Sequence, residues 1–135
     1  MMAKSNFESL RVYQLAEQLA DQIWSIVIGW DVFARDTVGK QLVKAADSIG
    51  ANIAEGTGRG SFVDNRRFVR IARGSLNETQ HWLRRAYKRQ LLNDKEVRNL
   101  KPIIDELAPK LNAYLKSIGD VPTGAKNNRQ LTTNN

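Results

Sequence analysis

Lys44-Ala-Ala-Asp-Ser-Ile-Gly-Ala-Asn-Ile-Ala-Glu-Gly56 and Arg73-Gly-Ser-Leu-Asn-Glu-Thr79 carry more structural information than any other part of this chain. Both stretches place small and polar residues beside apolar residues that recur every three or four positions, a pattern typical of amphipathic helices. Gly50 and Gly74 would each cost about 1 kcal/mol in a helix interior relative to alanine. Close contact between helix backbones would explain that cost, so we expect two tightly packed helices with polar side chains held between them.

Four amphipathic helices are predicted from the apolar periodicity, over about 12–29, 36–56, 61–92 and 93–118. No strand-like alternation is present. Short loops between long helices favour an all-α fold, an antiparallel up-down-up-down four-helix bundle spanning 1–118. The residues expected to face the core are Val12, Leu15, Ala16, Leu19, Ile23, Ile26, Val27, Val38, Leu42, Ala45, Ala46, Ile49, Ile53, Phe68, Val69, Ala72, Leu76, Thr79, Leu83, Ala86, Val97, Leu100, Ile104, Leu107, Leu111 and Leu115.

Helix ends are marked by capping residues. Ser61 and Asp64 form the pattern of a capping box, in which each side chain bonds to the other's backbone amide, and Asn93 with Glu96 repeats it. Trp30 is expected in the connection between the first two helices, as is Phe33.

Two prolines, Pro102 and Pro109, fall within the fourth helix, seven residues apart and opposite its apolar stripe. We expect one curved or kinked helix, convex toward solvent, and not two helices. The polar segment 119–135 has too little apolar surface to offset the entropy of ordering and is expected to be a disordered tail.

The SIGANIAEG motif at 48–56 and the GSLNET motif at 74–79 resemble a known family. It comprises the bacterial four-helix-bundle proteins encoded in intervening sequences of large-subunit ribosomal RNA genes, which are related to the accessory (variability determinant) proteins of diversity-generating retroelements. The resemblance covers about residues 7–118. The positions that match the family's structural motif are Ser48, Asn52, Glu55, Ser75 and Glu78.

The resemblance implies a ring-like homopentamer without catalytic activity. It also implies, for the retroelement accessory proteins, a basic surface that binds nucleic acid and engages a reverse transcriptase. The strong basicity of this chain resembles that branch more than the less basic intervening-sequence proteins, and the branch stays open. The number of subunits stays open as well.

Enzyme chemistry is disfavoured by the composition. The chain has no cysteine and one histidine, His81, so metal sites built on Cys/His sets and thiolate nucleophiles are excluded within one chain. No cofactor or metal is expected. The N-terminus is polar and lacks the apolar run of a signal peptide or membrane span, so a cytoplasmic protein without membrane association is expected.

A polar stripe on the second helix comprises Gln41, Ser48, Asn52 and Glu55. One interpretation is a ligand or proton-transfer site, since a carboxylate, an amide and a hydroxyl share one face. The favoured interpretation is a structural polar network, in which these side chains bond to Ser75, Glu78 and Thr79 of the third helix and fix its register.

The loop Gly56-Thr-Gly-Arg-Gly60 is glycine-rich. A phosphate-binding Walker loop would need a preceding strand and a following Gly-Lys-Ser/Thr, and both are missing. We interpret the loop as a helix end and flexible turn, with Arg59 available for contact with a phosphate.

A basic stripe dominates the third helix. Between Phe62 and Leu91 there are eight cations against two anions, an excess of six within a net charge of +7. At 100° per residue, the cations Arg70, Arg73, Arg84 and Lys88 lie within about 40° of Arg66, and the stripe extends over about 33 Å. An ordinary solvated surface is one explanation. Acidic residues at i±4 are almost absent, however, which favours a polyanionic partner.

The leading hypothesis is therefore a non-enzymatic, oligomeric nucleic-acid-binding accessory protein that assists a reverse transcriptase of a diversity-generating retroelement. The alternative is a protein-interaction scaffold of the intervening-sequence family without a direct nucleic-acid role. The sequence does not distinguish DNA, RNA and hybrid partners. A homo-oligomer is expected because four aromatic residues, Trp24, Trp30, Phe33 and Trp82, exceed what the four core stripes absorb.

Overall fold

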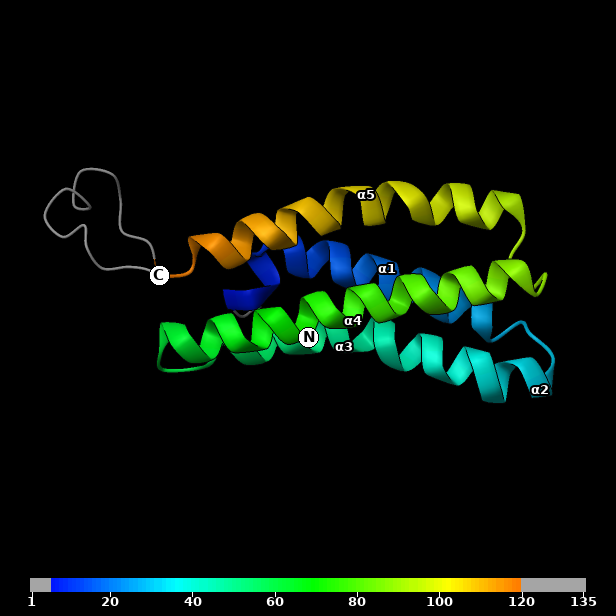
Figure 1. Ribbon diagram of the computed structural model, residues 1–135, viewed down its shortest axis with the longest axis horizontal. Coiled ribbons are helices and arrows are strands. Elements are labelled where there is room, and N and C mark those ends of the chain that lie inside the picture. The colour runs from blue at the N-terminus through cyan, green and yellow to red at the C-terminus, as the bar shows by residue number, and fades with distance from the viewer. Residues whose placement is uncertain (1–5, 120–135) are drawn as a thin grey trace, which may run out of the picture.

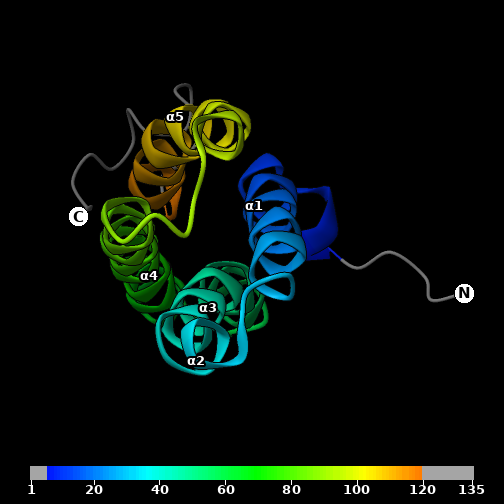
Figure 2. The same ribbon diagram turned by 90° about the vertical axis from the view of Figure 1, so that its right-hand side faces the viewer.

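The computed structural model describes residues 6–119 and contains four long helices that run alternately in opposite directions (Figure 1). Viewed along the bundle, the helices follow one another around the axis in chain order, and the first and last are neighbours (Figure 2). This arrangement confirms the predicted all-α four-helix bundle, and the order agrees with an up-down-up-down topology.

The elements are a short 3₁₀ turn, three long α-helices, and one helix assembled from three consecutive segments. In chain order they are η1 (Asn6–Ser9), α1 (Arg11–Val27), α2 (Val32–Ala34), the π-helical η2 (Arg35–Gly39), α3 (Lys40–Thr57), α4 (Phe62–Lys88) and α5 (Asp94–Ser117). No strand occurs among residues 6–119, and none of these helices is long and apolar enough to cross a bilayer.

The core runs along the bundle axis and is built from all four helices. Its fully buried large side chains are Leu15, Leu19, Ile23, Leu42, Ile49, Ile53, Val69, Leu76, Thr79, Leu107 and Leu111. All of these belong to the predicted inward stripes. On α5 the structure differs in detail, because Ile103 is buried and Ile104 only half-buried. On α4, the prediction for Phe68 is wrong: the residue is only half-buried, and its ring lies against the guanidinium groups of Arg59 and Arg67.

The second long helix begins earlier than predicted. Asp31 caps it by accepting a hydrogen bond from the Ala34 amide at 3.2 Å, so the helical segment starts at Val32 and not near Asp36. Phe33 therefore lies in a helix and not in the connection, with 78% of its surface exposed. The helix start was missed because the cap, Asp31, precedes a turn whose apolar Val32 and Phe33 face solvent, so no apolar stripe marks that turn. Val38, within the π turn of η2, is buried as predicted.

Most predicted helix ends are confirmed. The Ser61 side chain accepts a hydrogen bond from the Asp64 amide at 3.1 Å, and Asn93 with Glu96 forms the full capping box of α5. The Asp64 carboxylate returns no hydrogen bond to the Ser61 amide within the described residues, so only half of the predicted capping box forms, and Oδ1 of Asp64 lies 3.8 Å from Nε of Arg67. A left-handed Gln90, with φ of 64°, ends α4, and the next amide returns to the Ala86 carbonyl at 2.8 Å.

The two prolines lie inside one uninterrupted α5, as predicted. Both Pro102 and Pro109 are exposed. Proline lacks an amide hydrogen and leaves the carbonyl four residues earlier without its helical donor, a loss that is tolerated on an outer face open to solvent.

Two glycines explain how closely the helices approach, and a third does not. A Cβ at buried Gly56 would lie 2.5 Å from Oδ1 and 3.2 Å from the carbonyl oxygen of Asn65, so α4 passes directly over this point of α3. Gly50 faces α1, where a Cβ would lie 3.3 Å from the Tyr13 ring. Gly74 is exposed, with nothing within 4 Å of its Cβ position, so the close contact predicted for it is wrong within one subunit. Apart from Gly119, the segment 119–135 that was predicted to be a disordered tail lies outside the described residues.

Candidate nucleic-acid interface

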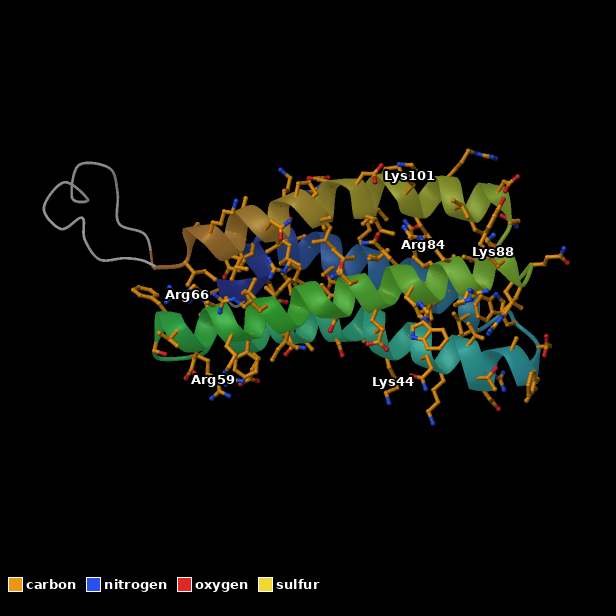
Figure 3. The ribbon with its side chains drawn as sticks, viewed as in Figure 1. Lys44, Arg59, Arg66, Arg84, Lys88 and Lys101 are labelled. Atoms are coloured by element: carbon orange, nitrogen blue, oxygen red, sulfur yellow. The ribbon has the colours of Figure 1, made fainter. Side chains whose placement is uncertain are left out.

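The basic stripe lies on α4 and turns toward α5. Burial of Val69, Ala72 and Leu76 fixes the rotation of α4, which places Arg70, Arg73, Arg84 and Lys88 outside. Arg66, Arg84 and Lys88 all lie on the side of α4 that faces α5 (Figure 3). The stripe therefore borders the α4–α5 seam and is not centred opposite the core.

Arg66 is half-buried and already has a partner. Its Nη1 donates a hydrogen bond of 2.9 Å to the carbonyl oxygen of Ile118, the residue that ends α5. The last carbonyls of a helix lack donors within the helix and carry partial negative charge. Arg66 thus stabilises the end of α5, and its charge is less available to a phosphate than predicted.

Arg73 also reaches α5, where its Nη1 donates to Oδ1 of Asn112 at 3.3 Å. Because asparagine is neutral, this bond orients the guanidinium without cancelling its charge. Arg73 is exposed and keeps other donors free, since a guanidinium has five.

Arg70, Arg84 and Lys88 are exposed, and no residue among 6–119 forms an ion pair or hydrogen bond with their side-chain nitrogens. They follow one line along α4, from Arg70 to Lys88 over about 27 Å at 1.5 Å per residue. These three residues are the most available cations of the stripe, and we call them the free α4 cations.

Arg59 belongs to a different surface. Its Nη2 lies 3.3 Å from Oε2 of Glu55, and its guanidinium carbon lies 4.7 Å from the centre of the Phe68 ring. It points away from α5, on the side of the bundle opposite Arg84 (Figure 3). The structure therefore separates Arg59 from the basic stripe.

The polar residues of α3 and α4 bond within their own helices. Nδ2 of Asn52 donates to the Ser48 carbonyl at 2.8 Å, and Oγ1 of Thr79 donates to the Ser75 carbonyl at 2.8 Å. Oε2 of Glu78 accepts from Nε1 of Trp82 at 3.3 Å. Gln41 is exposed.

No hydrogen bond from α3 to α4 joins the side chains of this polar stripe in the described part of the chain, contrary to the interhelical pairing we predicted. The reason is local: a polar side chain in a helix reaches the carbonyl four residues earlier without requiring a partner on another helix.

Elsewhere on the surface, pKa shifts arise from ion pairs and burial. Hydrogen bonds from Arg11 lower the pKa of the Glu106 carboxyl, while burial and the nearby Asp21 carboxylate raise the pKa of Asp47. The hydrogen bond from Tyr87 to Asp94 raises the pKa of the Tyr87 hydroxyl. No group of three or more His, Asp or Glu residues within 6–119 is arranged to hold a metal ion.

The sequence profile of the 23S rRNA-intervening sequence protein family matches residues 8–113, which is most of the chain. The chain belongs to this family. Among solved structures, it is similar to a protein of unknown function from the S23 ribosomal protein family of Bacteroides thetaiotaomicron VPI-5482. The two share 23% identity with a TM-score of 0.69, over 78% of this chain and 98% of the other. That likeness establishes the shared fold. A search of curated proteins finds no match.

In this 23S rRNA-intervening sequence protein, the sequence marks Tyr87 as the one aromatic residue beside the basic stripe that could stack a base, and too few aromatic residues accompany it to suggest sequence-specific single-strand binding. What the sequence did not predict is the contact that Tyr87 makes at the end of α4. Tyr87 is exposed, and its hydroxyl donates a hydrogen bond of 3.0 Å to Oδ1 of Asp94 across the α4–α5 loop. The sequence offers one signal for this contact. Tyr87 lies within a run of cations, and Asp94 follows seven residues later, after the end of the helix.

The second feature missed is a cation–aromatic cluster. Arg67 joins Arg59 over the Phe68 ring, with its guanidinium carbon 4.5 Å from the ring centre. The Phe68 ring had been expected to face the core.

Proposed function

We propose that this chain is a non-enzymatic, oligomeric nucleic-acid-binding accessory protein that contacts phosphate backbones through α4. The observation that carries the proposal is the line of free α4 cations, Arg70, Arg84 and Lys88, which no described anionic side chain neutralises. Like charges along one helix repel one another, and a polyanion relieves that repulsion while releasing its condensed counterions.

The expected contact is with the backbone. The span of about 27 Å from Arg70 to Lys88 is slightly less than one turn of duplex, about 34 Å. Arginine and lysine side chains that contact only phosphates position a nucleic acid without reading its sequence. We therefore expect modest sequence specificity, for DNA, RNA or a hybrid.

Oligomerisation supports the same function, because each subunit would repeat the stripe and multiply weak contacts through effective concentration. Exposed apolar residues near the end of α1 supply a surface for a second copy, since Trp24 and Ile28 are each 54% exposed. A homopentamer, as the family resemblance implies, is the preferred assembly. For the retroelement branch, the accessory role would be to assist a reverse transcriptase.

The alternative function is a protein-interaction scaffold without a nucleic-acid partner. The observation that favours it is the hollow of about 310 Å³ lined by Trp24, Val27, Ile28 and Val43, with Lys40 and Lys44 at its edge. An apolar pocket beside cations also suits an acidic protein surface, so the two functions must be separated by direct binding.

The test is the affinity for a generic duplex, measured by fluorescence anisotropy between about 50 mM and about 200 mM salt. We expect the logarithm of the association constant to fall by about 0.9 per phosphate contact for each tenfold rise in salt. A variant with Arg70→Gln, Arg84→Gln and Lys88→Gln should bind more weakly for all sequences alike, with a flatter slope, because glutamine keeps the helix propensity but not the charge.

The matched control is Lys110→Gln with Lys116→Gln, two exposed cations of α5. If this control weakens binding as much as the α4 variant, the assignment to α4 is wrong. If the wild type binds no duplex at low salt but captures an acidic protein, the scaffold function replaces the proposal.

A further inference from the structure

A hollow of about 430 Å³ lies between α4 and α5, close to the loop that joins them. Its floor is apolar and consists of Leu83, Leu92, Val97, Leu100 and Ile104. The volume falls within the range of about 300–1,000 Å³ typical of small-molecule sites. We call this hollow the α4–α5 groove.

The rim of the groove carries positive charge that the chain leaves unpaired. Arg84 and Lys88, two of the free α4 cations, line it together with Lys101. Lys101 is paired with Asp105, whose Oδ2 lies 2.6 Å from its Nζ. Thus two cations without an ion-pair partner lie on the α4 side of the apolar groove, which the Asp94 carboxylate, the acceptor of the Tyr87 hydrogen bond, also lines.

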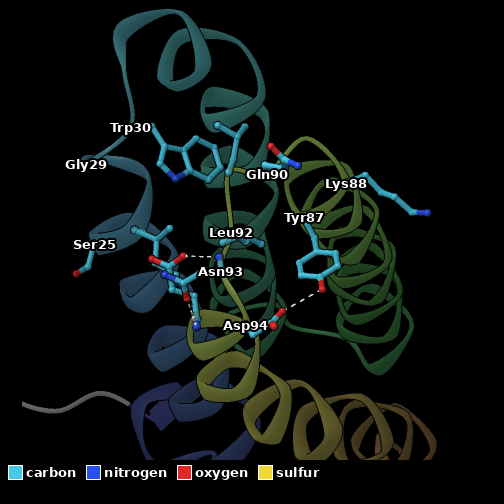
Figure 4. A pocket seen from close by; sticks show the side chains of 12 residues that line it. Ser25, Gly29, Trp30, Tyr87, Lys88, Gln90, Leu92, Asn93 and Asp94 are labelled. Atoms are coloured by element: carbon cyan, nitrogen blue, oxygen red, sulfur yellow. Dashed lines mark hydrogen bonds between the residues drawn. The ribbon is translucent and has the colours of Figure 1, made fainter.

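The Tyr87 ring forms one wall of the groove and is fixed in place. It is 48% exposed, and the hydrogen bond to Asp94 ties its hydroxyl to the first turn of α5. Figure 4 shows the ring between the end of α4 and the start of α5, with Lys88 extending outward beside it. Tyr87 also lines a larger hollow of about 960 Å³ at the end of the bundle, which Trp30 borders.

These features together match a nucleotide. A nucleobase is flat with apolar faces and stacks on aromatic rings, while its flanking phosphates need cations. We propose that the α4–α5 groove receives an unpaired nucleobase of single-stranded DNA or RNA, which stacks on Tyr87 while Arg84 and Lys88 hold the neighbouring phosphates. This inference rests on the proposed backbone-binding function of α4.

The consequence is a preference among nucleic acids that charge alone would not produce. Bases inside a duplex are stacked on each other and unavailable, whereas those of single strands and overhangs are free to enter the groove. The basic stripe would lead a strand along α4 to the aromatic wall at its end.

The test compares two labelled single-stranded DNAs of about 12 nucleotides, one intact and one with abasic sites in its central half, so that phosphate number is equal and only bases differ. We expect the wild type to bind the intact strand about tenfold more tightly, the effect of one stacked base. Tyr87→Ala should remove this preference, and Tyr87→Phe should retain it because the ring remains. Phe33→Ala, which removes another exposed aromatic ring, is the matched control.

The possible results separate this inference from the proposed function. If intact and abasic strands bind equally well, the groove does not take a base, but binding of both in a salt-dependent manner leaves the backbone proposal intact. If Tyr87→Ala keeps the preference while its thermal unfolding matches the wild type, the base binds elsewhere and the inference is wrong. If no nucleic acid binds at low salt, both proposals are wrong.

Discussion

Nη1 of Arg66 donates a hydrogen bond to the carbonyl oxygen of Ile118, at 2.9 Å and across 52 positions of the chain. The bond joins the first turns of α4 to the end of α5, two helices that a short loop connects at the opposite end of the bundle. It makes Arg66 a structural residue within the stripe, in contrast to the free α4 cations.

Arg66→Gln is therefore expected to lower the free energy of unfolding by about 1 kcal/mol, because a carbonyl at the end of α5 loses a charged donor. Thermal unfolding followed by circular dichroism measures the change. Arg70→Gln is the control, since this exposed neighbour on the same stripe has no described partner. Equal melting of the two variants would show that the bond to Ile118 contributes nothing.

Two glycine substitutions should have opposite effects. Gly74→Ala should stabilise the protein by about 1 kcal/mol, because the site is an exposed helix interior with open space around it. Gly56→Ala should destabilise it by about 1–3 kcal/mol, since the new methyl would force α4 away at Asn65. Denaturant unfolding compares them, and a Gly56→Ala protein as stable as Gly74→Ala would contradict the close approach of α3 and α4.

Asn52→Ala and Glu55→Ala should differ, although both belong to the polar stripe. Loss of the part-buried bond from Asn52 to the Ser48 carbonyl should cost about 1 kcal/mol. Loss of Glu55, exposed and paired only with Arg59, should change stability by less than about 0.5 kcal/mol. Thermal unfolding tests both. An Asn52→Ala protein that melts normally but loses a ligand would give the stripe a binding role.

The ion pair between α1 and α5 predicts an effect of pH. Nε and Nη2 of Arg11 lie 2.9 and 2.8 Å from the Glu106 carboxylate, which lowers its pKa below the ordinary value of 4.5. A lowered folded-state pKa gives stability that is present above the ordinary value and is lost as pH falls through the lowered one. Glu106→Gln should reduce the loss of stability on acidification, measured as melting temperature against pH.

Asp47 has the opposite effect on the pH dependence of stability, because its pKa is raised in the folded protein. The folded state then binds the proton more tightly, so the contribution of Asp47 to stability falls as pH rises through the raised pKa. Asp47→Asn should accordingly stabilise the protein at neutral pH and leave its stability in acid unchanged. A variant that is less stable at neutral pH would contradict the direction of this shift.

Self-association is the last prediction. At micromolar concentration, light scattering coupled to size exclusion should give a mass several times that of one chain. The pentamer is the preferred assembly and would give five times that mass. Trp24→Gln with Ile28→Gln should lower that mass, because both side chains are more than half exposed and apolar. Phe62→Gln, at the opposite end of the bundle, is the control. A wild type that elutes as a monomer would refute the prediction.

Features encoded within a few residues could be predicted from the sequence. The cap at Ser61 and the capping box of Asn93 and Glu96 depend on groups three residues apart, and the core stripes depend on a repeat along one helix. The period failed at the start of the second long helix, where the exposed Val32 and Phe33 extend the helix without adding to its core stripe.

The candidate site depends on contacts between distant parts of the chain. The partner of Arg66 lies 52 residues away, and that of Arg73 lies 39 away, so the helical wheel showed their common face but not their contacts with α5. The α4–α5 groove likewise exists only once two helices are packed together. For Gly74 the helical position was predicted correctly but the contact was not, because no neighbour lies within 4 Å of its Cβ position.

The π turn at Arg35–Gly39 marks a position at which the chain could lose one residue without shifting α3. A π turn contains one residue more than an α turn, so deletion of an exposed residue such as Thr37 would convert it to regular α-helix. The register of α3 against the core would stay the same, while α2 would rotate by about 100° and turn Phe33 toward a different direction. In an alignment of the family we therefore expect a single-residue gap here, accompanied by a change in the apolar side chains of α2.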